Sequence, residues 1–184
     1  MKNFKELTAM AILTALSVVL VAIVHFPIFP AVAFLEYDPA DIAILICGFA
    51  FGPGAGIATT IAAALIQGLT VSAQSGIYGI IMHIIATSAL VLMSSMIYRR
   101  NRTRRGALIS IICGVLTMTA VMIPANLFIT PVFMGAPREA VVQLLPYIVL
   151  FNFIKAGVNG LITFLVYKSI RVRFLGSNER KDNK

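Results

Sequence analysis

Long apolar runs, separated by short polar or proline- and glycine-rich segments, make up most of the chain. An α-helix needs about 20 predominantly apolar residues to cross the hydrocarbon core of a bilayer. Runs of this kind cover positions 7–28, 76–98 and 106–130, and a last helix is predicted to start near 141–145 and to end near 170. Pro146 falls in the first turns of that last helix, where proline is tolerated. The pattern therefore predicts four full membrane spans.

The apolar stretch between positions 40 and 69 is interrupted by Gly52-Pro53-Gly54. Proline and glycine together mark a turn, so two shorter helices are predicted over 40–51 and 55–69. Each is short for a span, and we expect it to be tilted or enclosed by longer neighbours. Loops are predicted over 29–39, 70–75 and 131–139. The expected fold is all-α, a polytopic membrane protein with six transmembrane helices.

Composition agrees with this pattern. Of the 184 residues, 59% are hydrophobic and 12% are charged, whereas soluble domains average about 45–50% and about 25%. The net charge of +8 comes from three basic clusters that flank apolar runs. Together they hold every basic residue except Arg138 and Lys155. The three clusters are Lys2 and Lys5; Arg99, Arg100, Arg102, Arg104 and Arg105; and Lys168, Arg171, Arg173, Arg180, Lys181 and Lys184.

Six helices place all three basic clusters on one side of the membrane. Because basic loops are retained in the cytoplasm, we expect both termini to be cytoplasmic. We expect a single six-helix membrane domain over 1–172 and a basic cytoplasmic tail over 173–184. No basic residue lies in a segment that would form a soluble domain, so we do not expect the protein to bind nucleic acid.

Sequence motifs of enzymes are missing. There is no G-x-x-x-x-G-K-[ST] phosphate loop, no H-E-x-x-H and no G-x-S-x-G elbow. Cys47 and Cys113 lie in apolar runs without metal-ligand spacing and are predicted to be small buried hydrophobes. No internal repeat is visible, so an inverted-repeat carrier is not supported. We therefore expect no catalytic residue, no metal site and no cofactor.

Lys155 lies about midway along the last predicted helix. An ionisable group at that depth is costly and usually functional. Asn152 and Asn159 lie three residues before it and four after it, on the same helix face. This polar stripe predicts a ligand pocket. The alternative is hydrogen bonding between helices by the asparagines, for which a lysine is seldom needed.

Two other intramembrane residues have two interpretations each. Asn126 follows Pro124 closely, so it either contacts a ligand or makes a local hydrogen bond that repairs a proline kink. His83 is predicted to be either a hydrogen-bonded structural residue or a ligand contact. A metal is not expected there, because no other ligands accompany it.

Acidic residues gather where the chain re-enters the membrane, in Glu36-Tyr37-Asp38-Pro39-Ala40-Asp41. Asp41 or Asp38 can cap the following helix, and we favour Asp41 for that role. We expect Glu36 to contact a ligand. A carboxylate of this group is also a possible partner for Lys155.

Several stretches resemble the substrate-binding S components of energy-coupling-factor (ECF) transporters, and most closely their riboflavin-binding members. They span about 5–172 and are Glu36-Tyr37-Asp38-Pro39-Ala40-Asp41-Ile42, Gly48-Phe49-Ala50-Phe51-Gly52-Pro53-Gly54-Ala55-Gly56, Gly76-Ile77-Tyr78-Gly79-Ile80-Ile81-Met82-His83, Asn126-Leu127-Phe128-Ile129-Thr130-Pro131 and Phe151-Asn152-Phe153-Ile154-Lys155. The first and last are the more specific, since several S components share the glycine-rich turn.

The resemblance implies a subunit of the bacterial plasma membrane that binds riboflavin near the outer face. It implies a transmembrane T component and two cytoplasmic ATPases as partners. Asn152 and Lys155 match residues that contact the flavin in the family. Asn126 also matches a ligand contact, although the alignment around it rests on fewer residues. Ala11 and Ala15 match a pair of alanines that contacts the T component. Aromatic walls for the flat ring would include Tyr37 and Tyr78, and Glu36 or Asp38 would bond the hydroxyls of a ribityl chain.

Other functions remain open at this point. Within the family, the ligand could be another vitamin or a phosphorylated flavin (FMN), since Lys155 and Arg138 could attract a phosphate. Outside it, a self-sufficient small carrier, a purely structural subunit and a membrane enzyme are the alternatives. The last would need clustered acids or histidines at the bilayer surface, which the sequence does not show.

Overall fold

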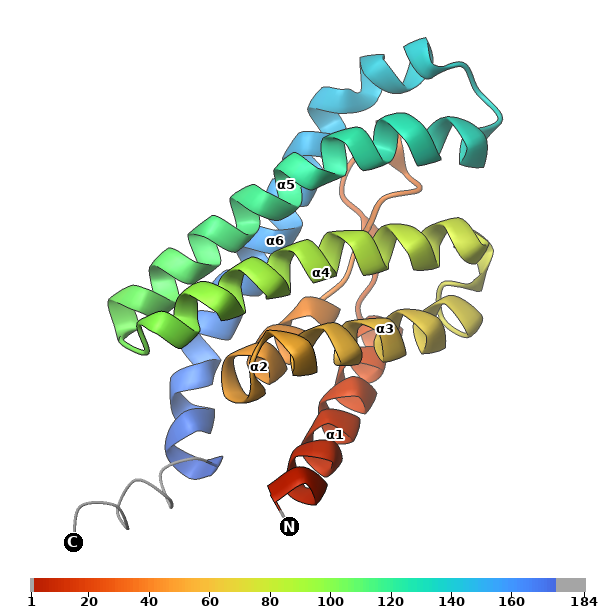
Figure 1. The fold of residues 1–184 in the computed structure, drawn as a ribbon. Helices are drawn as coiled ribbons and strands as arrows, with labels where there is room; N and C mark the ends of the chain where they lie inside the picture. The colour runs from red at the N-terminus through yellow and green to blue at the C-terminus, as the bar shows by residue number, and fades with distance from the viewer. Residues whose placement is uncertain (1, 175–184) are drawn as a thin grey trace, which may run out of the picture.

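The computed structural model describes residues 2–174, which form six α-helices connected by short segments (Figure 1). The helices are α1 (Lys2–Ile23), α2 (Ala40–Phe51), α3 (Pro53–Leu69), α4 (Gly76–Arg100), α5 (Arg104–Met134) and α6 (Arg138–Phe174). Of the basic tail expected over 173–184, positions 175–184 lie outside the described residues. The all-helical prediction with six helices is confirmed.

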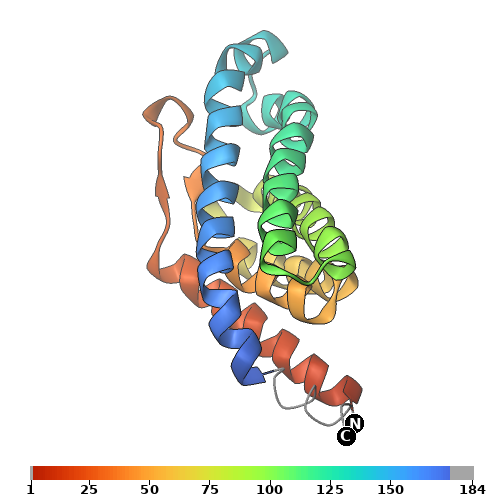
Figure 2. The same cartoon turned by 90° about the vertical axis from the view of Figure 1, so that its left-hand side faces the viewer.

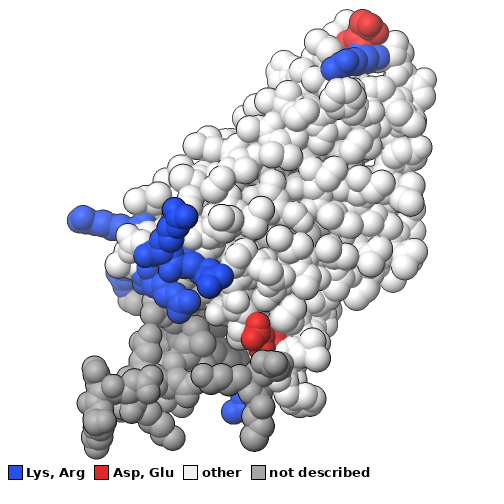
Figure 3. All heavy atoms as spheres, in the orientation of Figure 1, with Lys and Arg blue, Asp and Glu red and all other residues white. Residues whose placement is uncertain are grey.

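Four of these helices are long and apolar enough to cross a membrane, and they correspond to the four predicted spans. Large apolar side chains cover their outer faces; Phe4, Leu7, Leu116, Phe128 and Leu165 are all more than half exposed. The face drawn in Figure 3 is almost free of charge between its two ends, and most of its basic side chains gather at one end. Such a surface is suited to lipid, because a soluble protein rarely exposes apolar patches of this extent.

The short helix α2 forms the centre of the molecule. It contacts α1, α3, α4 and α6, and nine of its 12 residues are buried. Ile44, Leu45 and Phe49 belong to the main apolar core, together with residues of α3, α4, α5 and α6. The prediction that the two short helices are enclosed by longer neighbours therefore holds for α2. Helix α3 packs between α1 and α4 and leaves several apolar side chains exposed.

The segment between α1 and α2 was predicted as a loop but contains a small hairpin. Helix α1 ends at Ile23, five residues before the predicted end. Strand β1 (Phe26–Pro27) then pairs in antiparallel register with β2 (Glu36–Tyr37), and a 3₁₀ turn (Pro30–Val32) lies between them. Proline disfavours helix both at its own position and at the residue before it, which explains the early end of α1. Figure 2 shows this hairpin standing beside α6.

The connection between α5 and α6 is shorter than predicted. Helix α5 continues through Pro131 to Met134 and ends at Gly135, whose φ of 61° is left-handed. The N–H of Ala136 donates to the carbonyl of Pro131, as in a glycine-terminated helix end. Helix α6 starts at Arg138, so Pro146 lies in its interior instead of its first turns. One proline removes a single hydrogen bond, which a helix of this length tolerates when its neighbours hold it.

Candidate ligand-binding site

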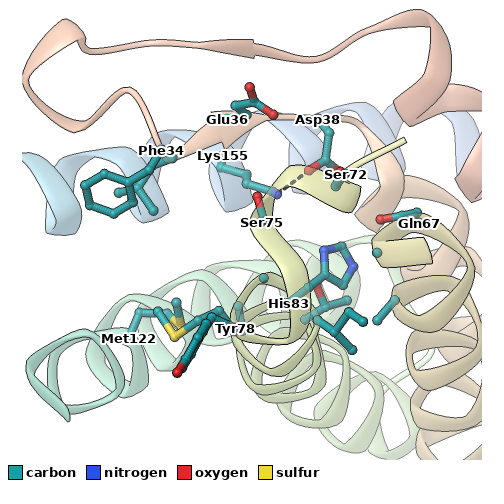
Figure 4. A pocket seen from close by; sticks show the side chains of 18 of the residues that line it. Phe34, Glu36, Asp38, Gln67, Ser72, Ser75, Tyr78, His83, Met122 and Lys155 are labelled. Carbon is teal, nitrogen blue, oxygen red and sulfur yellow. Dashed lines mark hydrogen bonds and ion pairs between the residues drawn. The ribbon is translucent and has the colours of Figure 1, made fainter. Parts of the chain in front are cut away.

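A cavity lies between α3, α4, α5, α6 and the end of the hairpin (Figure 4). None of the arginines of the α4–α5 turn, which is at one end of the molecule in Figure 1, lines it. The space inside it, counted together with the open solvent at its mouth, is about 1050 Å³. Of the predicted site residues, those lining it are Glu36, Asp38, Tyr78, His83, Asn126, Asn152 and Lys155. The cavity therefore brings together residues from distant parts of the sequence.

An ion pair spans one wall of the cavity. The Lys155 ammonium on α6 donates to Asp38 Oδ2 at 2.6 Å, and both side chains are about nine-tenths buried. The other oxygen, Oδ1, accepts the backbone N–H of Ala40 at the start of α2. Burial raises the pKa of the Asp38 carboxyl, but the neighbouring groups, the Lys155 ammonium foremost, together lower it more, so that its pKa lies below the usual value. Asp38 is thus a carboxylate that joins the hairpin to α6.

Asn159, one helical turn further along α6, forms hydrogen bonds to the same segment around Asp38. Its Nδ2 donates to the Asp38 carbonyl at 2.9 Å and to Asp41 Oδ2 at 3.2 Å, and its Oδ1 accepts the Tyr37 hydroxyl at 2.9 Å. Asp41 also accepts the Thr87 hydroxyl of α4 at 2.7 Å. Neither Asn159 nor Tyr37 lines the cavity, although both were predicted as ligand contacts. Their observed partners are protein groups that hold α2 and the hairpin in place.

The capping role expected of Asp41 falls to Asp38. Asp41 is fully buried in the first turn of α2, and its two oxygens are bonded to α4 and α6. Asp38 instead accepts the N–H of the first helical residue. The sequence alone could not separate these two aspartates, because both lie within reach of the helix start and only their partners distinguish them.

The two other asparagines of the site make local bonds and still line the cavity. Asn152 donates to the Ile148 carbonyl at 2.8 Å. Asn126 donates to the Met122 carbonyl and accepts the Thr130 hydroxyl. A proline frees the carbonyl four residues before it, which for Pro124 is that of Ala120. The Asn126 bond therefore does not repair the proline gap; it fixes the orientation of the amide at the cavity wall.

His83 has an unused polar atom at the cavity. Its Nε2 is buried and meets no hydrogen-bond partner among the described residues. In Figure 4 its ring lies below the ion pair of Asp38 and Lys155 and faces the same space. Buried polar atoms are nearly always satisfied, so this nitrogen is a position where a ligand or a water would bind. The geometry favours the ligand-contact interpretation over that of a satisfied structural histidine.

Glu36 and Tyr78 lie at the cavity's edge. The Glu36 carboxylate is half-buried in strand β2 and is reached by Gln74 Nε2 at 3.5 Å. The Tyr78 ring on α4 packs against Phe133 of α5, which in turn contacts Phe34 of the hairpin. These three rings form an aromatic wall, with the Met122 side chain nearby in Figure 4.

Several lining residues were not predicted as site residues. They are Gln67 of α3, Ser72 and Ser75 of the α3–α4 connection, Thr87 of α4, and Met118 and Met122 of α5. Gln67 is buried and bonded to Ser17 of α1. A glutamine near a helix end and methionines in an apolar helix are common in any membrane protein. Only their position in space relates them to the site.

The site contains donors and acceptors but no arrangement for metal chemistry. Within residues 2–174, no group of three or more His, Cys, Asp or Glu side chains could hold a metal ion. Both cysteines are free thiols, and Cys47 is bonded to the Thr59 hydroxyl. The arrangement can bind a flat, partly apolar molecule between aromatic and aliphatic walls and hydrogen-bond its polar edge.

The small residues predicted to contact a partner lie away from this site. Ala11 and Ala15 are exposed on α1, next to Ile12 and Leu16, which are also exposed. Small residues four apart allow another helix to approach closely. This face of α1 is therefore open to a neighbouring helix.

Comparisons with known proteins agree with this geometry. Residues 5–167 match the model of the family described as the substrate-specific component of ECF transporters. A solved structure of the S component of a bacterial ECF transporter shares 26% sequence identity, with a TM-score of 0.81, over 95% of this chain and 99% of that one. None of the curated proteins compared with this chain matches it.

Subunits of this family are not enzymes. They are multi-pass proteins of the cell membrane that bind a substrate for transport and work with a T component and ATPases. The matched range includes α2 to α5 in full, most of α1 and α6, and every residue of the site described above. The chain therefore belongs to the substrate-specific S components of ECF transporters.

Proposed function

We propose that this S component binds riboflavin with high affinity at the outer face of the membrane and releases it inside when it is coupled to the ATP-driven module. The observation that carries the proposal is the cavity that presents Asn152 and Lys155 of α6 opposite an aromatic wall. An isoalloxazine ring has apolar faces and an amide-like edge, so it needs such walls and a few placed donors.

The donors available to a flavin are well defined. An ammonium has three N–H groups, and Lys155 uses one of them on Asp38. The other two are free to reach ring carbonyl oxygens. His83 Nε2 adds a group that can donate or accept, depending on its tautomer. Glu36, at the mouth of the cavity, is suited to accept hydrogen bonds from the hydroxyls of the ribityl chain.

The location of the cavity fits uptake from outside. It lies away from the α4–α5 turn and its arginines, and the charged ends of the molecule are separated by an apolar surface (Figure 3). If the arginine end is cytoplasmic, the cavity is in the outer half of the membrane. In the same orientation, Ala11 and Ala15 face the T component within the bilayer.

Another vitamin or FMN is the alternative ligand, and a self-sufficient small carrier is the alternative mode of action. A carrier would support uptake in cells without any ATPase partner, whereas an S component would not. The family match favours the S component.

An absorbance spectrum of the detergent-purified protein is the first test. We expect a flavin spectrum that survives washing, at close to one flavin per chain, and quenching of the fluorescence of riboflavin added to the emptied protein. A colourless protein that leaves riboflavin fluorescence unchanged would overturn the flavin assignment and leave an S component for a different vitamin.

A further inference from the structure

The charge inside the cavity is negative overall. Its titratable lining groups are the carboxylates of Glu36 and Asp38, the ammonium of Lys155, the imidazoles of His25 and His83 and the phenol of Tyr78. A third carboxylate, Asp41, lies directly behind Asp38 and shares the Asn159 amide with it. With both imidazoles neutral, the carboxylates outnumber the ammonium, so the cavity does not attract an anion.

The single lysine of the cavity is already neutralised. Its nitrogen lies 2.6 Å from Asp38 Oδ2, and both side chains are buried. A phosphate at Lys155 would have to compete with this carboxylate or lie beside it. Two negative groups that share one buried cation repel each other strongly, because the effective dielectric constant there is low. If the flavin ring meets Lys155 instead, the phosphate at the end of the ribityl chain lies near the Glu36 carboxylate.

No other lysine or arginine of the described chain lines the cavity. Arg138, the other cation considered for phosphate binding, lies at the start of α6 with its guanidinium 5.0 Å from the centre of the Phe128 ring. The arginines of the α4–α5 turn lie at the opposite end of the molecule (Figures 1 and 3). Despite the net charge of +8, Lys155 is thus the one lysine or arginine among the described residues that lines the cavity.

We propose that the cavity selects uncharged ligands and rejects phosphorylated ones, and that Asp38 is the specificity-determining residue because it occupies Lys155. The inference rests on the proposed flavin-binding function and narrows it to the unphosphorylated vitamin. Lys155 then acts through its remaining N–H groups as a hydrogen-bond donor to a neutral edge, while Asp38 cancels its attraction for an anion.

The test compares three flavins on the purified, emptied protein: riboflavin, FMN and a neutral riboflavin 5′-ester of similar bulk to FMN. We expect riboflavin and the ester to bind similarly and FMN to bind at least about tenfold more weakly, because its phosphate adds negative charge to a cavity that is already negative. Equal binding of riboflavin and FMN would overturn the inference and leave the proposed function standing. An ester as weak as FMN would overturn it too, because bulk would then explain the selectivity.

The variant Asp38→Asn is the second test of this selectivity. Asparagine retains an Oδ1 that can accept the Ala40 N–H, so the start of α2 keeps its bond. We expect the preference for riboflavin over FMN to shrink by about tenfold or to reverse, since Lys155 is then unpaired.

Glu139→Gln, an exposed acidic position outside the cavity, is the matched control and should leave the preference unchanged. An unaltered preference in Asp38→Asn would remove Asp38 from the specificity role. If Asp38→Asn does not fold, the ligand series on the unmodified protein still decides the question, and a protein that binds no flavin overturns the proposed function together with this inference.

Discussion

A buried ion pair at a ligand cavity has a different meaning from one on a surface. Taking Lys155 and Asp38 out of water costs several kcal/mol per ion, and only a close contact with further hydrogen bonds offsets that cost. The Ala40 N–H and the Lys155 ammonium supply such bonds to Asp38. Removing one partner leaves the other charge buried and unpaired, so each residue of the pair can be tested by substitution.

Lys155→Ala is expected to weaken riboflavin binding by roughly ten- to a hundredfold, because a hydrogen bond from a charged donor contributes about 1.5–3 kcal/mol. Titration of riboflavin fluorescence on the detergent-purified variant measures the loss. A single monodisperse peak in gel filtration serves as the folding control. Unchanged affinity in a folded variant would defeat the assignment of Lys155 to the ligand site.

Asn159 offers a contrast, since its bonds go to protein groups. We expect Asn159→Leu to lower the midpoint of thermal unfolding of the ligand-free protein, because Asp38, Asp41 and Tyr37 lose their common partner. Each buried polar group left without a hydrogen bond costs about 1–3 kcal/mol. Asn152→Ala, which removes one bond to its own helix, is the comparison. It should change the ligand-free midpoint less and riboflavin affinity more. The reverse order would contradict the roles given to the two asparagines.

Sequence reasoning about the site residues reached furthest where the side chain itself is unusual. A lysine in the middle of an apolar helix is rare, and the structure places Lys155 in the lining of the cavity. Its contact with a ligand stays a prediction. Asn159 lies on the same stripe, yet only its distance to Asp38 and Asp41 shows that it bonds protein groups. The unpartnered Nε2 of His83 could not be predicted either, because satisfaction of a buried atom depends on every neighbour in space.

Among the elements, α2, α3 and α4 pack unusually closely at two glycines. A Cβ at Gly56 of α3 would stand 2.6 Å from Val91 Cγ2 of α4 and 3.2 Å from the Gly48 Cα of α2. Side chains at these positions would force the three helices apart. Close approach through small residues is a common way to stabilise helices in membranes, where apolar burial gives little preference between lipid and protein.

Gly56→Ala is expected to destabilise the protein by about 1–3 kcal/mol, the usual cost of an added methyl in a close-packed interface. Gly54→Ala is the matched control in the same helix, because no atom lies within 4 Å of a Cβ built there. Thermal unfolding in detergent compares the two. Equal midpoints for the two variants would show that the α2–α3–α4 contact is looser than the structure has it.

The exposed face of α1 leads to a prediction about transport. Ala11→Leu with Ala15→Leu should leave riboflavin binding by the isolated subunit unchanged and abolish copurification with the T component, since bulky residues prevent close helix contact. Ala58→Leu, at another exposed alanine, on α3, is the control. Retained copurification of the double variant would move the T-component contact to another face.

At the scale of whole elements, periodicity and length predicted the helices well and their ends less well. Pro131 and Gly135 are both helix-ending residues, and only the left-handed conformation of Gly135 shows which one ends α5. The β1–β2 hairpin was not predicted, because strands of two residues carry no periodic pattern. It matters for function, since β2 leads directly into Asp38.

For the whole molecule, the orientation in the membrane remains a prediction of the positive-inside rule. The α4–α5 turn and the α5–α6 turn lie at opposite ends (Figure 1). In a chain whose cysteines have been replaced, Ala136→Cys should react with an impermeant maleimide in intact cells, whereas Asn101→Cys should react only after permeabilisation. The opposite pattern would place the cavity in the inner half of the membrane and contradict uptake from outside.

The sequence by itself determined the class of this protein: a six-helix membrane fold without enzyme motifs, a lysine at a functional depth, and a resemblance to the S components that the family match bears out. These properties follow from local composition and spacing, which act over one or two helix turns. Only the tertiary structure decided which polar groups meet. The pairing of Asp38 with Lys155, and the bonds from Asn159 to two aspartates, join residues more than 110 positions apart. A hydrogen bond forms only when the distance between donor and acceptor is right to within a few tenths of an ångström. The order of residues along the chain does not specify such distances.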